Sequence, residues 1–89
     1  MRIDLFLNAV NLVKRRAVAQ DMIAHGAVLV GGAAVKAAKN VKIGDIIELR
    51  LLAKDGGARS HKYEVLQIPA AKNTPKEARD QYIREINDR

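Results

Sequence analysis

The spacing of the apolar residues changes at Gly26, and this change constrains the possible folds more than any other feature of the sequence. Before Gly26, apolar side chains recur at the spacing of an amphipathic helix. After it, short apolar stretches alternate with polar residues and are separated by glycines, as is typical of strands and tight turns. With 89 residues, the chain is long enough for one core. The helices and the strands must share that core, and we predict an α+β fold.

Two helices are predicted ahead of Gly26. Asp4 has the residue type of an N-cap, and residues 5–10 would form a short, mostly apolar helix after it. The second helix is predicted over residues 14–25, with Gly26 as the residue that ends it. A break near residues 11–12 separates the two segments. The first third of the chain is therefore predicted to be a helical hairpin.

Strands and turns are predicted after Gly26. Gly31 and Gly32 would form a tight turn between a strand that ends at residue 30 and a returning strand over residues 33–36. A polar loop over residues 39–45 ends in a Gly44–Asp45 turn and leads to a strand over residues 46–52. Residues 54–58 have the composition of a hairpin loop, and the last strand is predicted over residues 61–68. These elements indicate a small, mainly antiparallel sheet.

The C-terminal segment carries the signals of a further helix. Thr74, Pro75 and Glu77 have the spacing of an N-cap, a first-turn proline and a capping box. An apolar stripe at helical spacing follows, formed by Ala78, Tyr82, Ile83 and Ile86. We therefore predict one domain over residues 1–68, ending in its strand hairpin, and a linker with a C-terminal helix over residues 69–89.

The balance of charge points to an anionic partner. Lys and Arg number 16 against 10 Asp and Glu, which gives a formal net charge of +6. Such a surplus on a small domain is typical of nucleic-acid binding, although basic residues also serve only to solubilise a surface. The chain has no Cys, which excludes disulfides and thiolate metal sites, and its apolar runs are too short to span a bilayer. We expect a cytoplasmic protein without a membrane partner, a metal or another cofactor.

The placement of the cations favours binding over solubility. Lys14, Arg15 and Arg16 form a block at the start of the second predicted helix, where positive charge opposes the helix dipole. The sequence shows no residue that compensates for this. The same geometry suits a phosphate backbone, because cations that point outward lie beside free N–H groups. The alternative is that the block is simply solvated.

Other cations are weaker candidates for the same surface. Arg2 is ambiguous alone, because it can pair with Asp4 or with Asp21. Lysines in the loop after the predicted hairpin either contact a partner or discourage strand-to-strand aggregation. These loop lysines are Lys36, Lys39 and Lys42.

Base stacking and catalysis find little support in the sequence. The aromatic residues are Phe6, Tyr63 and Tyr82, and we expect them in the core, which argues against a stacking platform for single strands. Ser60 and His61 are adjacent, but adjacent strand residues point to opposite faces, so they do not form a nucleophile–base pair. Recognition of a folded RNA by shape and phosphate contacts fits better. We expect a protein that is not an enzyme.

The order of these segments resembles the S-four (alpha-L) RNA-binding domain. The resemblance extends over residues 2–52 and rests on Arg2-Ile3-Asp4 with Phe6-Leu7, Lys14-Arg15-Arg16 with Ala19 and Ile23, the run Gly-Ala-Val-Leu-Val-Gly-Gly at 26–32, and Val41 with Gly44-Asp45. Two turn residues depart from the family pattern, which usually has Asn at the position of Gly31 and often Pro at that of Ile43. The chain is also similar to short stand-alone family members that act in bacterial ribosome-associated quality control, and to the fifteen-kilodalton heat-shock protein.

This resemblance implies a factor that binds an obstructed large ribosomal subunit carrying peptidyl-tRNA and contacts both the rRNA and the tRNA. It also implies an RqcH-type tailing factor as partner, with an alanine tail added to the stalled chain. By position, the RNA-contacting residues would be Arg2, Lys14, Arg15 and Arg16, with Lys36, Lys39 and Lys42 as secondary contacts. We expect the protein to be a monomer.

Three other functions remain open from the sequence. One is the recycling of blocked large subunits in the manner of the heat-shock protein, and another is the regulation of other structured RNAs. The third is a protein-interaction module whose C-terminal helix lays one apolar stripe into a partner groove. That stripe would consist of Ala78, Tyr82 and Ile86.

Overall fold

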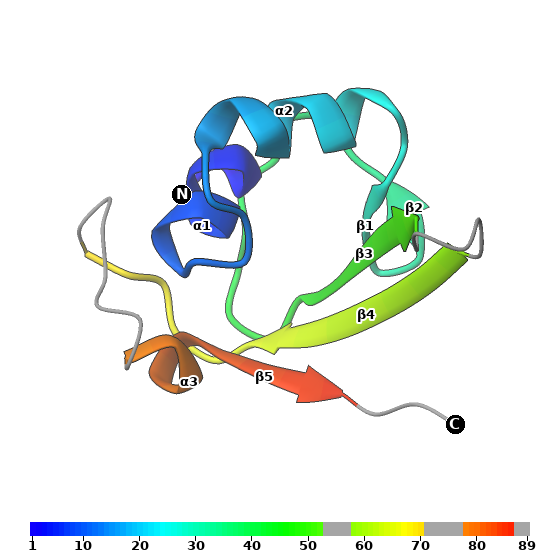
Figure 1. Cartoon of the computed structure of the whole chain (residues 1–89). Helices are drawn as coiled ribbons and strands as arrows, with labels where there is room; N and C mark the ends of the chain where they lie inside the picture. Colours follow the sequence, from blue (N-terminus) through cyan, green and yellow to red (C-terminus); the bar gives the residue numbers. More distant parts are fainter. Residues whose placement is uncertain (53–57, 71–77, 87–89) are drawn as a thin grey trace.

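The structure is a computed structural model, and it describes residues 1–52, 58–70 and 78–86. Two helices, α1 and α2, lie on one side of a five-stranded sheet, and a short helix, α3, lies near one end of it (Figure 1). The predicted α+β class, with a helical hairpin on an antiparallel sheet, is confirmed. Within the described ranges, none of the helices has the length and apolar character that a bilayer crossing requires.

The helical hairpin consists of α1, Ile3–Ala9, and α2, Arg16–Ala24. The N-cap of α1 is Arg2, so Asp4 lies inside the first turn of the helix and the prediction of Asp4 as the N-cap is wrong. The reason is that its carboxylate is buried against side chains of α2 instead of facing the solvent. α2 starts two residues later than predicted, and Gly26, with φ 72°, follows its C-cap as expected.

The strands run antiparallel to their neighbours in the order β2-β1-β3-β4-β5. Gly31 and Gly32 form the predicted tight turn between β1 and β2, and their φ angles of 61° and 86° are ones that residues with a Cβ rarely adopt. β3 coincides with the predicted strand, β2 is shorter, and β4 begins and ends earlier than predicted. The bounds are Val28–Val30 for β1, Ala33–Ala34 for β2, Ile46–Leu52 for β3, Ala58–Val65 for β4 and Ile83–Ile86 for β5.

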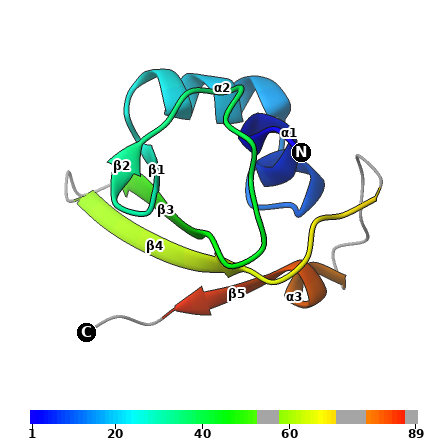
Figure 2. The same cartoon turned by 180° about the vertical axis from the view of Figure 1, so that it is seen from behind.

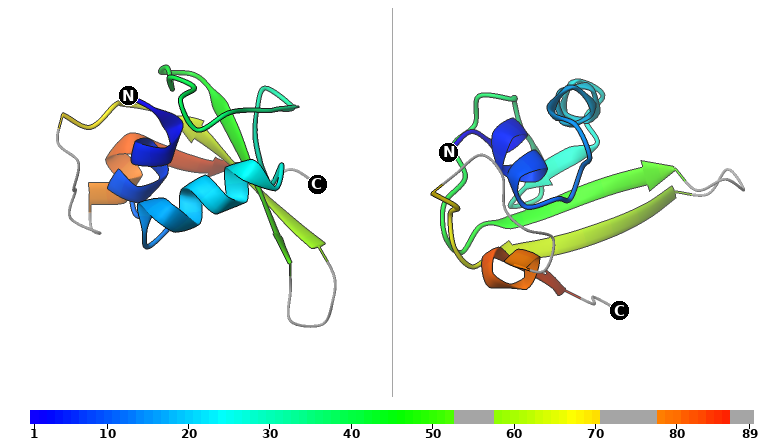
Figure 3. Two further views of the ribbon diagram at one scale, coloured as in Figure 1. Left: turned by 90° about the horizontal axis from the view of Figure 1, so that it is seen from above. Right: turned by 60° about the vertical axis from the view of Figure 1, so that its left-hand side comes forward.

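The core lies between the helical hairpin and one face of the sheet. Figure 2 shows the segment between β2 and β3 passing along the side of this layer, and Figure 3 shows α2 lying over the strands. Phe6 and Tyr63 are buried there, as expected from the sequence. Each large apolar side chain that leaves water contributes about 1.5–3 kcal/mol to stability. The large, fully buried apolar residues are Ile3, Phe6, Leu7, Val10, Val28, Ile47 and Val65.

The C-terminal segment differs from the prediction. Its helix is only the short α3, Arg79–Tyr82, and the chain continues as β5. β5 pairs with β4, with Ile83 opposite Val65, and Ile83 is buried in the core. Pairing with the edge of β4 and the burial of Ile83 outweigh the local helix signals. The capping-box residues 74–77 and most of the predicted 54–58 loop lie outside the described residues, and the domain division at residue 68 stays a prediction.

Candidate nucleic-acid interface

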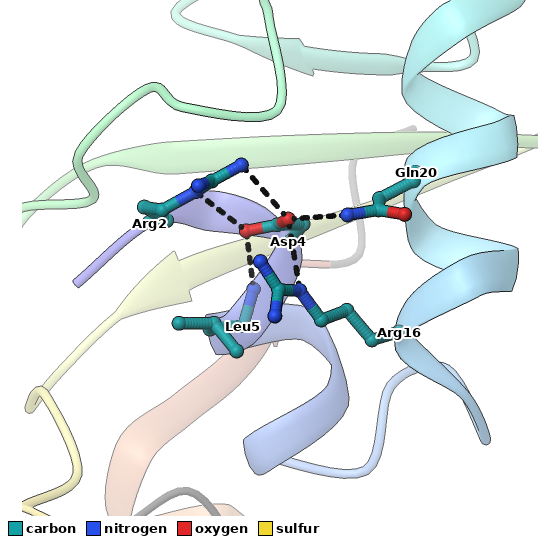
Figure 4. A network of polar contacts seen from close by, with 5 residues as sticks. All are labelled: Arg2, Asp4, Leu5, Arg16 and Gln20. Carbon is teal, nitrogen blue, oxygen red and sulfur yellow. Dashed lines mark hydrogen bonds and ion pairs between the residues drawn. The ribbon is translucent and has the colours of Figure 1, made fainter.

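Asp4 is the centre of a polar network that joins the start of α1 to α2 (Figure 4). Its side chain is 0% exposed. Arg16 Nε donates to Asp4 Oδ2 at 3.1 Å, and Gln20 Nε2 donates to the same oxygen at 3.0 Å. The Leu5 N–H donates to Oδ1 at 2.8 Å, and Arg2 Nε lies 3.3 Å from that oxygen. Both oxygens of the carboxylate have partners, and two of these partners, Arg2 and Arg16, are cations.

These contacts keep Asp4 ionised. Burial by itself raises the pKa of the carboxyl group. The hydrogen bonds from Gln20 and Arg16, the bond from the Leu5 N–H and the positive charge of Arg16 together outweigh burial. They hold the pKa of Asp4 below its ordinary value of 3.8. A buried charge of this kind stabilises the fold only while its partners are present.

The network brings two arginines from different elements to one carboxylate. The side chains of Arg2 and Arg16 each remain 43% exposed. Arg16 contacts Asp4 through Nε, which leaves its Nη groups to reach a phosphate. No compensation was predicted for the cations at the start of α2, and for Arg16 this prediction is wrong, because Asp4 neutralises it. Of the two acidic residues open to Arg2, the structure pairs it with Asp4, whereas Asp21 pairs with His25.

Lys14 and Arg15 are exposed where the chain enters α2, and Arg15 is the N-cap. Asn8 fastens this turn to α1, since its Nδ2 donates to the carbonyl oxygens of Val13 at 3.3 Å and Lys14 at 3.1 Å. Among the described residues, neither Lys14 nor Arg15 forms a side-chain ion pair. The roles of Asn8 and Gln20 were not predictable from the sequence, because they depend on how the two helices pack.

The segment between β2 and β3 places Lys39 beside the start of α1. The Lys39 carbonyl accepts the Ile3 N–H at 2.7 Å, and the next residue forms a bridge with Arg2. Lys36 is one turn earlier, and its carbonyl accepts the Lys39 N–H at 3.0 Å. Lys42 lies further on, in the turn that leads to β3. The structure thus brings Lys39 to Arg2, with Lys36 and Lys42 along the same segment. We call these lysines and the cations at the helix starts the basic surface: Arg2, Lys14, Arg15, Arg16, Lys36, Lys39 and Lys42.

Other described charges on the sheet form ion pairs within β3 or between β4 and β5. Ion pairs join Arg50 to Glu48, Arg84 to Glu64 and His61 to Glu85. Ser60 lies opposite Arg50 and His61 opposite Leu49, so Ser60 and His61 point to opposite faces as predicted. The described residues contain no group of three potential metal ligands. The starts of the two helices and the segment between β2 and β3 present a set of exposed cations, which is suited to binding phosphates.

A helical hairpin laid on a small antiparallel sheet, with exposed cations at the start of both helices, defines a small RNA-binding domain of the alpha-L class. The S4 domain model matches residues 1–47. The chain therefore belongs to the S4 domain family, as its motifs indicated.

Similar proteins extend this match beyond the domain itself. The chain is 48% identical to the "RQC P-site tRNA stabilizing factor" of Helicobacter pylori (strain ATCC 700392 / 26695), over 93% of each chain. It is similar to the trimeric structure of heat shock protein 15 from Vibrio cholerae, with a TM-score of 0.82 and 28% identity over 97% of this chain and 81% of that one. It is also similar to the solution structure of a hypothetical protein, HP1423, with a TM-score of 0.80 and 46% identity over 100% of both chains. The resemblance to short stand-alone members of the family is confirmed.

Proposed function

We propose that this protein is a non-enzymatic, cytoplasmic factor that binds obstructed large ribosomal subunits carrying peptidyl-tRNA. It contacts the rRNA and the tRNA and, with an RqcH-type tailing factor, supports alanine tailing of the stalled chain. The observation that carries this proposal is the arginine pair held at one buried carboxylate, next to exposed Lys14 and Arg15. The name of the Helicobacter pylori relative, which refers to P-site tRNA, supports the ribosomal setting.

The physical basis of binding is electrostatic. Guanidinium groups bind phosphate oxygens with two parallel hydrogen bonds, and phosphate contacts supply most of the affinity for nucleic acid. Ordering a flexible side chain on binding costs about 0.5–1.5 kcal/mol, and the bonds from Arg2 and Arg16 to Asp4 reduce that cost in advance. Lys36, Lys39 and Lys42 serve as secondary contacts. All of these residues belong to one chain, so we propose that the monomer binds.

The first experiment is a sucrose gradient of a lysate that contains the tagged protein, with large-subunit fractions probed for tRNA. We expect the protein to migrate with tRNA-bearing large subunits and to be released as salt rises. Arg15→Glu should abolish this migration. Arg59→Glu is the matched control, because it makes the same charge change at an exposed residue of β4 and should leave migration intact. Migration at the top of the gradient at low and moderate salt would refute the proposal and favour regulation of other RNAs.

A second candidate function is recycling of blocked large subunits without tailing. The similarity to heat shock protein 15, which covers nearly the whole chain, favours it. The two functions separate in cells that lack the protein. Loss of alanine tails on stalled chains supports the tailing role, whereas unchanged tails with accumulated blocked subunits support recycling.

A further inference from the structure

Ile43 is an isoleucine that the fold leaves in water. Its relative exposure is 68%, and the other large hydrophobic side chain exposed in the described part of the chain, Val18, reaches 45%. The nearby segment is otherwise polar or small on its exposed side, with Lys39, Asn40, Lys42 and Gly44. A single exposed apolar residue is common on protein surfaces. Ile43 differs from such a residue because it lies in a hydrogen-bonded turn beside the basic surface.

The turn that carries Ile43 is held by three hydrogen bonds. The Asp45 N–H donates to the Lys42 carbonyl at 3.1 Å, and the Asp45 carboxylate accepts the Lys42 N–H at 2.9 Å. The Gly44 N–H donates to the Val65 carbonyl at 2.8 Å, which ties the turn to the end of β4. Gly44 has φ 93°, as the third residue of a type II turn requires. The side chain of Ile43 is therefore displayed from a fixed backbone.

The geometry of this turn does not itself call for isoleucine. Ile43 occupies the second position of a type II turn, where proline is the residue that the backbone favours. Its side chain is not needed for the core, because most of it is exposed. A large apolar group at such a position contributes little to folding, so its contribution is expected in a contact with another molecule.

The turn is continuous with the basic surface. The Val41 N–H donates to the Met1 carbonyl at 2.9 Å, two residues before Ile43, and Lys39 is bonded to the start of α1. Figure 2 shows the whole segment running from the level of α2 past the N-terminus to the end of β4. Ile43 thus lies at the end of a row of lysines, with Lys42 as its immediate neighbour.

We propose that Ile43 is an apolar anchor that packs against the face of an unstacked nucleotide in the bound RNA, while Lys42 contacts a neighbouring phosphate. The inference rests on the proposed function and names what one part of the basic surface contacts. Unstacked nucleotides combine an apolar base face with flanking phosphates, which matches an isoleucine at the end of a row of lysines. Apolar side chains are known to insert against bases, and the aromatic residues Phe6 and Tyr63 are buried in the core here. A protein partner would place the lysines against acidic groups, and a photo-crosslink from position 43 distinguishes a protein from a nucleotide.

The first test measures the Kd for purified large subunits carrying P-site tRNA over a range of salt concentrations. Ile43→Ser should weaken binding about tenfold at every salt concentration, because it removes apolar contact and no charge. Ile43→Leu, the matched control, should bind within about twofold of the unaltered protein. Lys42→Ala should instead reduce the log–log salt slope by about 0.7–0.9. Equal melting temperatures for both Ile43 variants would show that the fold is intact.

The outcomes separate this inference from the proposed function. Unaltered protein that fails to bind at any salt concentration would overturn the proposed function and this inference with it. Binding of unaltered protein together with equal binding of Ile43→Ser would overturn the inference alone. A benzophenone amino acid at position 43 then identifies the contact on the same subunits. We expect a photo-crosslink to rRNA or tRNA, and a crosslink only to a ribosomal protein would overturn the assignment to a nucleotide.

Discussion

At the scale of single residues, Asp4 explains why two arginines lie together on the surface. The guanidinium groups of Arg2 and Arg16 repel each other, and the attraction of both to the Asp4 carboxylate offsets that repulsion. Because the carboxylate is buried, its attraction is screened less than that of a surface carboxylate. Asp4 therefore holds two cations of the basic surface in place. Removal of its charge should lower the stability of the fold, and should change RNA binding only through the positions of Arg2 and Arg16.

We predict that Asp4→Asn lowers the free energy of unfolding by about 2 kcal/mol at pH 7. The loss of stability is larger when one partner of a fully buried ion pair is removed. Here both arginine side chains are nearly half exposed and can be solvated after the substitution. The pH dependence provides the check. The folded-state pKa of Asp4 lies below 3.8, so its stabilisation is present above the unfolded pKa and is lost as the pH falls through the folded pKa. Urea unfolding should show the two proteins converging as the pH falls below 3.8, and a constant difference would contradict this.

Arg15 and Arg16 are neighbours in the sequence, but the structure gives them different roles. Arg16 is bonded to buried Asp4, whereas Arg15 is an exposed N-cap without a side-chain ion pair among the described residues. Arg16→Ala should lower the melting temperature by roughly 4–8 °C, which corresponds to about 1 kcal/mol in a domain of this size. Arg15→Ala should leave it within about 1 °C. Both should weaken RNA binding, and equal melting temperatures would contradict the role of Arg16.

At the scale of elements, the entrance to α2 depends on a side chain of α1. Asn8 bonds the Val13 and Lys14 carbonyls, so Asn8→Ala should cost about 1 kcal/mol of stability. Native-state hydrogen exchange should then be faster at the Val18 and Ala19 amides, which bond to the Arg15 carbonyl in the first turn of α2. Asn40→Ala makes the same change at an exposed loop residue and serves as the control. Unchanged exchange at α2 would show that Asn8 does not hold the turn.

The C-terminal strand offers a comparison between the predicted and observed elements. On a helix, Ile83 and Ile86 would share one face and respond alike to substitution. In β5, Ile83 is 3% exposed, whereas Ile86 is only half buried and points to the other face of the sheet. Ile83→Ser should lower stability by about 3 kcal/mol, and Ile86→Ser by less than about 1 kcal/mol. Similar losses in urea unfolding would favour the helix over the strand.

At the scale of the whole molecule, the sequence allowed prediction of those features that neighbouring residues decide. The Gly31–Gly32 turn follows from the freedom of glycine to adopt positive φ, and β3 follows from its alternation of apolar and polar residues. The contact of Asp4 with Gln20 and the pairing of β5 with β4 were not predictable, because each joins segments that meet only after packing. The residues of the candidate site likewise fall into those that were predictable from the sequence and those that were not. The cationic block was visible in the sequence, but the carboxylate that supports Arg16 required the fold.

The placement of charge, and not its total, should decide binding. Two double variants change the formal net charge equally, from +6 to +4. The first combines Lys14→Ala with Arg15→Ala, and the second combines Arg50→Ala with Arg84→Ala. Arg50 is paired with Glu48 within β3, and Arg84 is paired with Glu64 of the neighbouring strand, so their loss leaves the basic surface intact. In titrations of large subunits against salt, the first pair should reduce the log–log slope by about 1.5, and the second should leave it unchanged. Equal reductions would mean that the protein binds through its overall charge, and the basic surface would lose its special role.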